Sequence, residues 1–435
     1  MADRIAIIAD DLTGASDSGV QFVRKGLRTA VLFDTRQLAA DIARVDTVSL
    51  DTDSRALTAD QARNRAEQAA HRLNSAGVTH YYKKMDSTLR GNPGAEVDGV
   101  MNAVPFDLAV VAPAFPRLGR TTVGGRHYLH GIDIMETEIA RDPKAPATSD
   151  VVQLFARQSA RQVGRVTQDT LDQGPAAVLN AVAAQLERAV TIIVFDAARE
   201  EDLAHIATTM AGSGYRVLWV GSAGLAEYVP EALGFKGQGL ASAPLPVTDR
   251  PVMLVAGSRA AIARAQVDAA RQRPGVVAVT LDARELLRAA DVCQSETDRC
   301  DALLRAALAE ERDIILTVGS EEPAVAAALA LGASLEMGPT AVGERIADAL
   351  GAIAAGVITG SRLQAVIMTG GDTAVSVCRH LGVTGLELLR ELETGVPISR
   401  MLGGPDLLAV TKAGAFGTEQ TLARAMDALR GGDFP

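Results

Sequence analysis

Residues 5–14 read IAIIADDLTG, and their pattern indicates the fold class. Five apolar residues are followed at once by two aspartates, a threonine and a glycine, which is typical of a buried strand that ends in a polar turn before a helix. Similar short apolar runs recur along the chain. Segments rich in Ala, Leu, Gln and Arg, such as 59–75 and 176–187, separate them and favour helix. The sequence therefore predicts an α/β protein with largely parallel sheets.

The apolar runs fall into two groups. The expected strands of the first group are 5–9, 29–33, 47–50, 80–83, 108–112, 191–195 and 216–220, and those of the second are 252–256, 276–280, 314–318, 365–368 and 407–410. Residues 231–250 collect glycine and proline and lose hydrophobic periodicity, as linkers do. We therefore expect two α/β domains, residues 1–230 and 251–435, with a cleft between them. Residues 113–131 are expected to form a long loop that covers a site.

The composition of the 435-residue chain disfavours several classes of protein. Hydrophobic residues make up 48% and charged residues 22%, which is typical of a folded protein. The net charge of −10 argues against a nucleic-acid partner. The apolar runs are about five residues long, whereas a membrane span needs about 20. Three cysteines without metal-ligand or CxxC spacing predict no disulfide framework. We expect a cytoplasmic protein that binds small molecules, and homo-oligomerisation stays open.

Candidate site residues follow the apolar runs, because ligands of open parallel sheets bind beyond the carboxyl ends of the strands. Asp10 and Asp11 could accept hydrogen bonds from sugar hydroxyls or hold Mg²⁺, although one of them could simply cap the helix that follows. Arg55 follows the run that ends at Leu50. It could bind a carboxylate through two parallel hydrogen bonds, but an arginine seen alone could equally be a solvated loop charge.

The densest polar group follows the run 80–83. Residues 83–92 read KKMDSTLRGN and bring together two lysines, an aspartate, two hydroxyl groups and an arginine. Such a mixture at a strand end suits a polyol acid or a phosphate better than it suits a chance cluster of surface charges. His127 and His130 could suggest a metal site, but no third ligand is evident, so loop or substrate contacts are the more ordinary interpretation.

Glycine turns characterise the second half of the chain. Residues 368–374 read MTGGDTA before a helical run at 375–381. Glycine lets the backbone approach an anion, and a helix start directs free N–H groups at phosphate. The alternative is a plain connection whose Asp or Thr caps the helix. Further glycine turns lie at 256–258, 318–320 and 412–417. Together they indicate a nucleotide, although neither GxxxxGK[ST] nor GxGxxG occurs.

These motifs, in this order, resemble the four-carbon acid sugar kinase family, and most closely its D-threonate kinase branch. The resemblance spans nearly the whole chain. It is carried by IADDLTGASDSG (8–19), DTDSRA (51–56), YKKMDSTLRGNPGAEV (82–97), GRTTVGG (119–125), HGIDIMETEIARDPKAP (130–146), VAGS (255–258), MTGGDTA (368–374) and TKAGAFG (411–417). One departure is that Arg259 and Ala260 follow Ser258 where the family often has further hydroxyl residues.

The resemblance implies an N-terminal domain that binds the acid and a C-terminal domain that binds ATP with Mg²⁺. By motif position, it assigns acid binding to Asp10, Asp11, Arg55, Lys84, Met85, Asp86, Ser87 and Arg90, and ATP binding to Ser258, Gly370, Gly371, Asp372, Thr373 and Gly414. Asp86 is the first candidate for the catalytic base. Asp372 is a rival that could instead bind the metal, and the metal ligands stay unknown.

The expected activity is ATP-dependent phosphorylation of the terminal hydroxyl of D-threonate, which gives D-threonate 4-phosphate. D-erythronate and 3-oxo-tetronate remain open as substrates, because they differ only in one stereocentre or oxidation state. A non-catalytic sugar-acid sensor would explain Arg55 and Lys84 but not the glycine turns after residue 250. The missing dinucleotide fingerprint disfavours a nicotinamide oxidoreductase.

Overall fold

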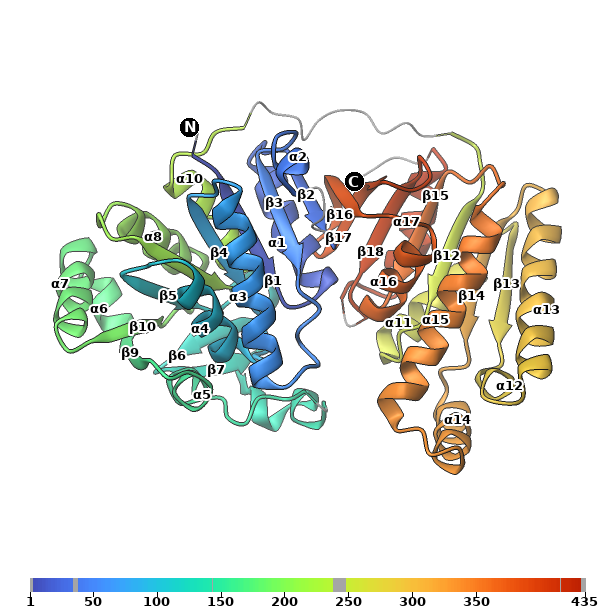
Figure 1. Cartoon of the computed structure of the whole chain (residues 1–435), viewed down its shortest axis with the longest axis horizontal. Helices are drawn as coiled ribbons and strands as arrows, with labels where there is room; N and C mark the ends of the chain where they lie inside the picture. The colour runs from blue at the N-terminus through green and yellow to red at the C-terminus, as the bar shows by residue number, and fades with distance from the viewer. Residues whose placement is uncertain (1–2, 34–37, 143, 238–247, 415, 432–435) are drawn as a thin grey trace. The chain divides into compact units, whose positions relative to one another are not determined.

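Parallel strands form the centre of both halves of the chain in the computed structural model, which describes residues 3–33, 38–142, 144–237, 248–414 and 416–431. The chain divides into two units, Met1–Ser242 and Ala243–Pro435. Each unit is a sheet with helices packed on it (Figure 1). The predicted α/β class with largely parallel sheets is confirmed. Of the predicted linker 231–250, residues 238–247 lie outside the described part of the chain.

The N-terminal sheet has the order β2-β3-β1-β4-β11-β5-β10-β9, and all neighbouring strands in it run parallel. Its strands are β1 (Ile5–Ala9), β2 (Thr29–Leu32), β3 (Thr47–Asp51), β4 (His80–Lys84), β5 (Leu108–Ala112), β9 (Gln162–Val166), β10 (Val190–Phe195) and β11 (Val217–Gly221). Ala9 lies opposite Asp51, and Lys84 lies opposite Gly221. The register therefore brings the turns after β1, β3 and β4 to one edge of the sheet.

The helices of this unit follow its strands along the chain. They are α1 (Leu12–Arg24), α2 (Leu38–Ile42), α3 (Ala59–Ser75), α4 (Pro93–Ala103), α5 (Val151–Gln158), α6 (Gln168–Asp172), α7 (Pro175–Leu186), α8 (Glu200–Ala211), α9 (Ala223–Ala226) and α10 (Val229–Ala232). A capping box at Thr58 and Gln61 starts α3, which packs on α4. Their backbones approach closely at Gly99, where an added Cβ would lie 2.2 Å from the carbonyl oxygen of Arg63.

The segment 113–131 is not the irregular loop that its composition suggested. It contains a 3-10 turn, Pro116–Leu118, and the strands β6 (Arg120–Val123) and β7 (Arg126–Leu129), which pair with β8 (Ile132–Asp133) in a small antiparallel sheet. Gly124 and Gly125 form the two-residue turn of the β6–β7 hairpin, with φ of 62° and 77°. Such a turn needs positive φ at both positions, and the sequence signal that was overlooked is this glycine pair. Two further 3-10 turns follow, Ile134–Glu136 and Glu138–Arg141.

The C-terminal sheet has the order β13-β14-β12-β15-β18-β17-β16. Its strands are β12 (Val252–Ala256), β13 (Val276–Leu281), β14 (Asp313–Val318), β15 (Ala365–Thr369), β16 (Gly385–Glu393), β17 (Val396–Leu402) and β18 (Leu408–Lys412). The first five strands in this order run parallel, whereas β17 is antiparallel to both its neighbours. The turns after β12, β15 and β18 therefore meet at one edge of this sheet.

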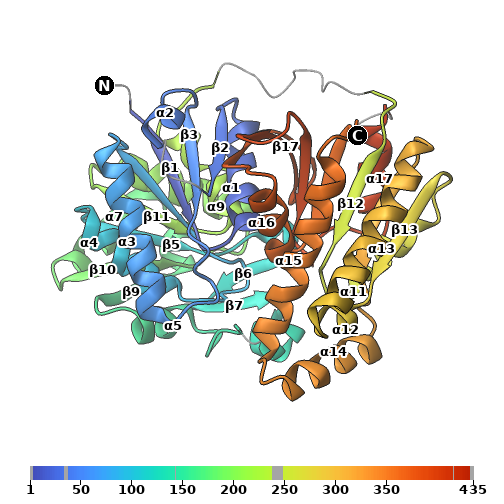
Figure 2. The ribbon, with the colours of Figure 1, turned by 45° about the vertical axis from the view of Figure 1, so that its right-hand side comes forward.

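Helices also pack on the C-terminal sheet. They are α11 (Ala261–Arg271), α12 (Ala283–Leu286), α13 (Ala290–Ala309), α14 (Glu322–Ser334), α15 (Pro339–Ile358), α16 (Gly371–His380) and α17 (Thr421–Leu429). α11 and α17 bury Val267 and Met426 in a core with strand residues such as Leu254 and Val410. α13 and α16 both pack on α15, which Figure 2 shows in orange. Among the described residues, no single helix is long and apolar enough to span a bilayer, and only the bent pair α14–α15 meets that test jointly.

Candidate active-site regions

Three side chains at the carboxyl ends of β1 and β3 form one ion-paired group. Arg55 donates from Nε to Oδ2 of Asp10 (2.6 Å) and from Nη2 to Oδ1 of Asp10 (2.9 Å). The same guanidinium donates from Nη1 and Nη2 to the two carboxylate oxygens of Asp11, both at 2.7 Å. Asp11 also caps α1 by accepting the N–H of Gly14 at 2.9 Å. Four of the five N–H donors of Arg55 are therefore used by aspartates of the protein itself.

Burial and charge act in opposite directions on this group. Burial would raise the pKa of Asp10, but Arg55 and the two lysines of β4 outweigh it and lower the pKa below its usual value. Burial likewise opposes the charge on Arg55, yet the carboxylates of Asp10, Asp11 and Asp86 hold its pKa well above the ordinary value. Asp10 and Arg55 therefore stay ionised around neutral pH as a fixed array of charges.

Asp51, the last residue of β3, behaves differently. Burial raises its pKa to about 8, and repulsion from Asp11, Asp53 and Asp10 adds to the shift. Its Oδ1 accepts the N–H of Asp53 at 2.8 Å. The carboxyl group of Asp51 is therefore mostly protonated at neutral pH, so it adds little negative charge to this edge of the sheet.

Asp86 is the centre of a second ion-paired group, in the turn after β4. Arg90 donates from Nε and Nη2 to its two carboxylate oxygens, at 2.8 and 3.0 Å. The hydroxyl group of Thr88 also donates to Asp86, and Nη1 of Arg55 lies 3.8 Å from its Oδ1. Burial would raise the pKa of Asp86, but Arg90 and then Arg55 hold it well below its usual range. Arg90 uses a third donor on Asp142, at 3.1 Å.

The other predicted acid-binding residues are Lys84 at the end of β4 and Met85 and Ser87 in the turn after it, and all three are buried. Nζ of Lys84 donates to the carbonyl oxygen of Met85 at 2.8 Å. It also lies over the first turn of α1, where a Cβ added to Gly14 would come within 3.0 Å of it. Met85 is 1% exposed, and its N–H is bonded to the carbonyl oxygen of Gly221 at 2.9 Å. Its side chain therefore belongs to the core of the N-terminal unit, and its backbone is fixed beside the site.

His127 supports this turn, a role that the sequence did not indicate. Its Nε2 lies 2.9 Å from the carbonyl oxygen of Ser87, and its Nδ1 lies 3.0 Å from the hydroxyl group of Thr122. Burial lowers the pKa of His127 to about 4, so the ring is neutral and carries one N–H. A carbonyl oxygen can only accept, which places that proton on Nε2. His127 therefore holds Ser87 in place from the β6–β7 hairpin.

Arg120 and Glu96 were also not singled out from the sequence as site residues. Arg120 begins β6, and the Asp86 carboxylate raises its pKa although burial lowers it overall. Glu96 lies in the first turn of α4, is 1% exposed, and its Oε2 lies 3.0 Å from Nζ of Lys83. Both belong to motifs of the resemblance, GRTTVGG and the end of YKKMDSTLRGNPGAEV, which is the signal that could have identified them.

The candidate nucleotide region is built mainly from backbone. A Cβ added to Gly257 would lie 2.2 Å from Oγ1 of Thr373, and one added to Gly414 would lie 2.1 Å from Oγ of Ser258. The glycine turns after β12, β15 and β18 therefore touch one another. Gly370, with φ of 107°, precedes α16, and no side chain in the described part of the chain caps that helix. Its first N–H groups are thus available to an anion.

Gly371, Asp372 and Thr373 form the first turn of α16, so all six predicted ATP-binding residues come together at this edge of the sheet. Asp372 is exposed there, whereas Thr373 is buried. In the described residues no group of three or more His, Cys, Asp or Glu side chains could hold a metal ion. Any Mg²⁺ here would therefore need ligands from the nucleotide phosphates, as is usual for this ion.

Lys412, at the end of β18, holds one of these turns in place. Its Nζ donates to the carbonyl oxygens of Ala413, Gly414 and Phe416, at 2.7, 3.1 and 3.0 Å. An ammonium group has three N–H donors, so all of them are used on the turn. Burial lowers the pKa of Lys412 to about 8. Its position makes Lys412 a support of the glycine turn at Gly414.

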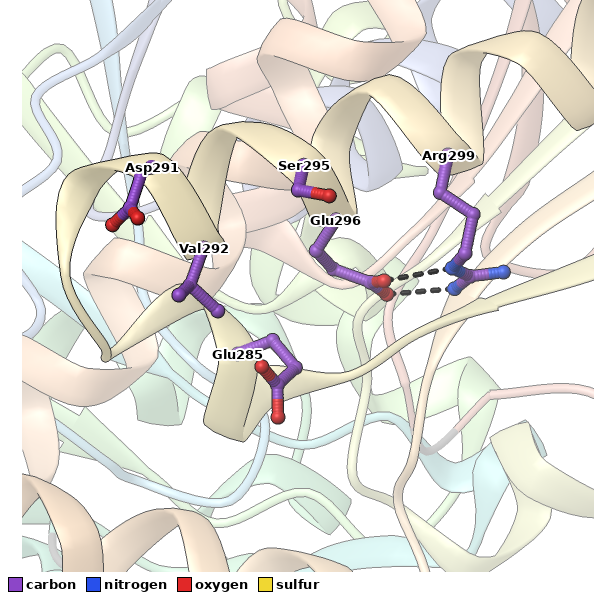
Figure 3. A pocket seen from close by; sticks show the side chains of 6 residues that line it. All are labelled: Glu285, Asp291, Val292, Ser295, Glu296 and Arg299. Carbon is purple, nitrogen blue, oxygen red and sulfur yellow. Dashed lines mark hydrogen bonds and ion pairs between the residues drawn. The ribbon is translucent and has the colours of Figure 1, made fainter.

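A hollow of the C-terminal surface contains none of the predicted site residues (Figure 3). Arg299 donates two hydrogen bonds to the carboxylate of Glu296, which also accepts the N–H of Asp282, so this carboxylate is used within the fold. We assign no function to this hollow. It is lined by Glu285, Asp291, Val292, Ser295, Glu296 and Arg299.

The two halves of the chain match two family models. Residues 5–229 match a sugar-binding N-terminal domain, and residues 253–422 match a nucleotide-binding C-terminal domain. The D-threonate kinase of Salmonella typhimurium is 35% identical to the chain over 428 residues, which is 97% of each protein. The chain belongs to the four-carbon acid sugar kinase family. The family predicted from the sequence motifs is therefore confirmed.

Two further proteins are similar to the chain over nearly its whole length. The D-erythronate kinase of Heliobacterium modesticaldum is 33% identical over 442 residues, covering 98% of this chain and 97% of its own. A solved structure from Salmonella typhimurium has a TM-score of 0.79 at 25% identity, over 98% of this chain and 99% of that protein. All candidate residues of both regions fall inside the segments matched by the family models.

Proposed function

We propose that the chain is an ATP-dependent kinase that phosphorylates the terminal (4-) hydroxyl of a four-carbon sugar acid, with D-threonate as the first candidate. The products are D-threonate 4-phosphate and ADP. The observation that carries this proposal is the similarity to D-threonate kinase over 97% of both chains. ATP as co-substrate suits a chain with a nucleotide-binding domain, and we propose a cytoplasmic location, where ATP is available.

The acid would bind at the charged edge of the N-terminal sheet. Asp10 and Asp86 are ionised and can accept hydrogen bonds from hydroxyl groups. Arg55 and Arg90 are already bonded to aspartates, so a substrate carboxylate would share or displace some of these bonds. Lys84 adds a buried positive charge beside them. The expected roles are thus orientation of the carboxylate by the arginines and selection of the hydroxyl groups by the aspartates.

Asp86 is our first candidate for the group that takes the hydroxyl proton. Its low pKa makes it a weak base in the state that the structure describes, because Arg90 and Thr88 already bind its oxygens. Phosphoryl transfer tolerates a weak base, since its loose transition state needs mainly positioning and neutralisation of charge. Asp372 is the rival, and its place in the first turn of α16 suits a metal ligand better.

The nucleotide phosphates would lie on the glycine turns at Ser258, Gly370–Thr373 and Gly414. Backbone N–H groups at the start of α16 would bind phosphate oxygens, and the missing side chains of the glycines would allow close approach. Bound Mg²⁺ would neutralise charge on the phosphates. Asp372 is the residue of this region that could hold it together with phosphate oxygens, an arrangement usual for Mg²⁺.

Release of ADP tests this function directly. The protein is assayed with ATP and Mg²⁺ against the four tetronate stereoisomers and their 3-oxo forms, with mass detection of the product. We expect acid-dependent ADP release with a 4-phosphorylated product, fastest for D-threonate. A faster reaction with D-erythronate or a 3-oxo-tetronate would reassign the substrate within the family. Binding of an acid without any turnover would instead support a sugar-acid sensor.

A further inference from the structure

Behind the charged edge of the N-terminal sheet, polar side chains form a continuous buried chain. The carboxyl group of Glu96 contacts Nζ of Lys83 with one oxygen, Oε2, at 3.0 Å, and the hydroxyl group of Ser54 with the other, Oε1. Oγ of Ser54 lies 2.7 Å from Oγ1 of Thr52, which in turn lies 2.7 Å from the carbonyl oxygen of Ala9. Relative exposures are 0% for Lys83 and Ser54 and 1% for Glu96.

This chain continues into the candidate acid-binding region. The backbone N–H groups of Ser54 and Arg55 both donate to the carbonyl oxygen of Asp10, at 2.9 and 3.2 Å. Nζ of Lys83 donates to the carbonyl oxygen of Lys84 at 2.6 Å. Glu96 therefore connects the turns after β1, β3 and β4 without itself reaching the surface of the site.

The number of protons available decides the direction of each hydrogen bond in the chain. The carbonyl oxygen of Ala9 can only accept, so Thr52 donates its single hydroxyl proton there. Thr52 must then accept from Ser54, which uses the single proton of Ser54. No hydroxyl proton is left for the contact between Ser54 and Glu96. A proton on Oε1 of Glu96 satisfies all three contacts, whereas an ionised carboxylate leaves two oxygen atoms facing each other without a hydrogen.

We propose that Glu96 is a protonated, neutral carboxylic acid in the folded protein, and that the charge of Lys83 is therefore not cancelled and acts on the acid-binding region. Glu96 and Lys83 are positioning residues in this scheme, because neither is assigned a contact with substrate. The part that concerns acid binding rests on the proposed function. The part that concerns the proton does not.

The surroundings of Glu96 favour the neutral form. Burial raises its pKa, and the Asp10 carboxylate of β1 raises it further, whereas the Lys83 ammonium of β4 lowers it. The balance is a pKa above the ordinary value. The Lys83 charge lowers the pKa of Asp10, so its effect reaches the site. A positive charge that is not cancelled beneath the site would favour an anionic substrate.

A matched pair of substitutions tests the proton. In Glu96→Gln, the amide can donate to Ser54 and accept from Lys83, as a protonated carboxyl group does. Asp98, also buried on α4, accepts from the hydroxyl group of Ser159 at 2.5 Å and from the N–H of Ala160 at 2.8 Å. Both of its oxygen atoms accept hydrogen bonds, so Asp98→Asn loses an acceptor. We expect an unchanged Tm for Glu96→Gln, and a Tm lower by about 2–4 °C for Asp98→Asn.

Infrared spectroscopy observes the proton itself. The difference spectrum between the unsubstituted protein and Glu96→Gln at pH 7 should contain the C=O stretch of a protonated carboxylic acid. The band of the Asp51 carboxyl group cancels in this spectrum, because both proteins contain Asp51. A carboxylate band instead, or a loss of Tm as large as that of Asp98→Asn, would overturn the proposal. Both measurements need no substrate, so they remain decisive if the protein phosphorylates no tetronate.

Lys83→Met tests the effect of the charge on acid binding. We expect the KM for the acid to rise about tenfold while the KM for ATP stays within about twofold, because the lost charge belongs to the acid-binding region. If Lys83 had only a structural role, the substitution would change both KM values or neither of them. Either result would overturn this part of the proposal.

Discussion

The two candidate regions use different chemistry at equivalent places, the carboxyl-end turns of parallel strands. In the N-terminal unit, charged side chains such as Arg55, Asp10 and Asp86 bind one another. In the C-terminal unit, glycine turns touch one another and leave backbone N–H groups at the start of α16. The N-terminal region can distinguish the shape and charge of a small acid, because each of its groups points in a fixed direction. The C-terminal region suits a phosphate chain, for which close approach matters more than side-chain identity.

The largest effect is expected from Asp86→Asn in the N-terminal region. Loss of the carboxylate removes the candidate base and frees Arg90, so turnover should fall about 10²- to 10⁴-fold with little change in the KM for ATP. Steady-state ADP release measures both. Asp142→Asn is the matched control, since Asp142 shares Arg90 at 3.1 Å without bonding to Asp86, and its effect should be much smaller. If Asp86→Asn turned over as fast as the unsubstituted protein, Asp86 would be excluded as the base.

A smaller effect is expected from Arg55→Ala, which leaves Asp10 and Asp11 without their shared partner. The KM for the acid should rise about ten- to 100-fold, and the KM for ATP should not change. Arg65→Ala is the control, because Arg65 binds the carbonyl oxygens of Thr52 and Asp53 on the same loop but not the aspartate pair. An unchanged KM for the acid would contradict a role of Arg55 in carboxylate binding.

Gly257→Ala in the C-terminal region is expected to affect the KM for ATP rather than the KM for the acid. The new Cβ would lie 2.2 Å from Oγ1 of Thr373, so the turns must separate and the KM for ATP should rise about tenfold. Gly343→Ala on α15 meets no atom within 4 Å and should leave both KM values unchanged. If Gly257→Ala raised the KM for the acid instead, the assignment of ATP to the C-terminal region and of the acid to the N-terminal region would be wrong.

The last prediction concerns the pH dependence of stability rather than catalysis. The pKa of Asp51 is about 8 in the folded protein, above its ordinary value of 3.8, so the folded state binds a proton more tightly than the unfolded state does. Stability should therefore fall as pH rises from about 4 to 8, and Asp51→Asn should remove this part of the slope. Urea unfolding at several pH values measures it. The difference in unfolding free energy between Asp51→Asn and the unsubstituted protein should therefore shift in favour of the variant as pH rises. If this difference does not change with pH, the raised pKa of Asp51 is wrong.

Much of the fold follows from local patterns in the sequence. The predicted strands 5–9, 108–112 and 252–256 and the helix 59–75 agree with the structure to the residue. Fully apolar strands and a capped helix are decided by neighbours in the chain. By contrast, β16 (Gly385–Glu393) consists mostly of Leu, Glu and Arg, which favour helix, and pairing with β17 overrides that preference.

The sequence indicated the positions of the candidate site but not its internal bonds. Strand-end placement was enough to group Asp10, Arg55 and Asp86, because parallel strands end at one edge. Which carboxylate Arg55 would bind, and that Glu96 of α4 would lie behind it, depends on the packing of α4 and on register. Those are tertiary properties that no local pattern contains.

Hydrogen exchange with mass spectrometry, with a non-hydrolysable ATP analogue and D-threonate added separately, measures which region each ligand binds. We expect the nucleotide to protect peptides containing Ser258, Gly370–Thr373 and Gly414, and the acid to protect those containing Asp10, Arg55 and Asp86. Protection of the N-terminal turns by the nucleotide, with the glycine turns unaffected, would contradict this assignment.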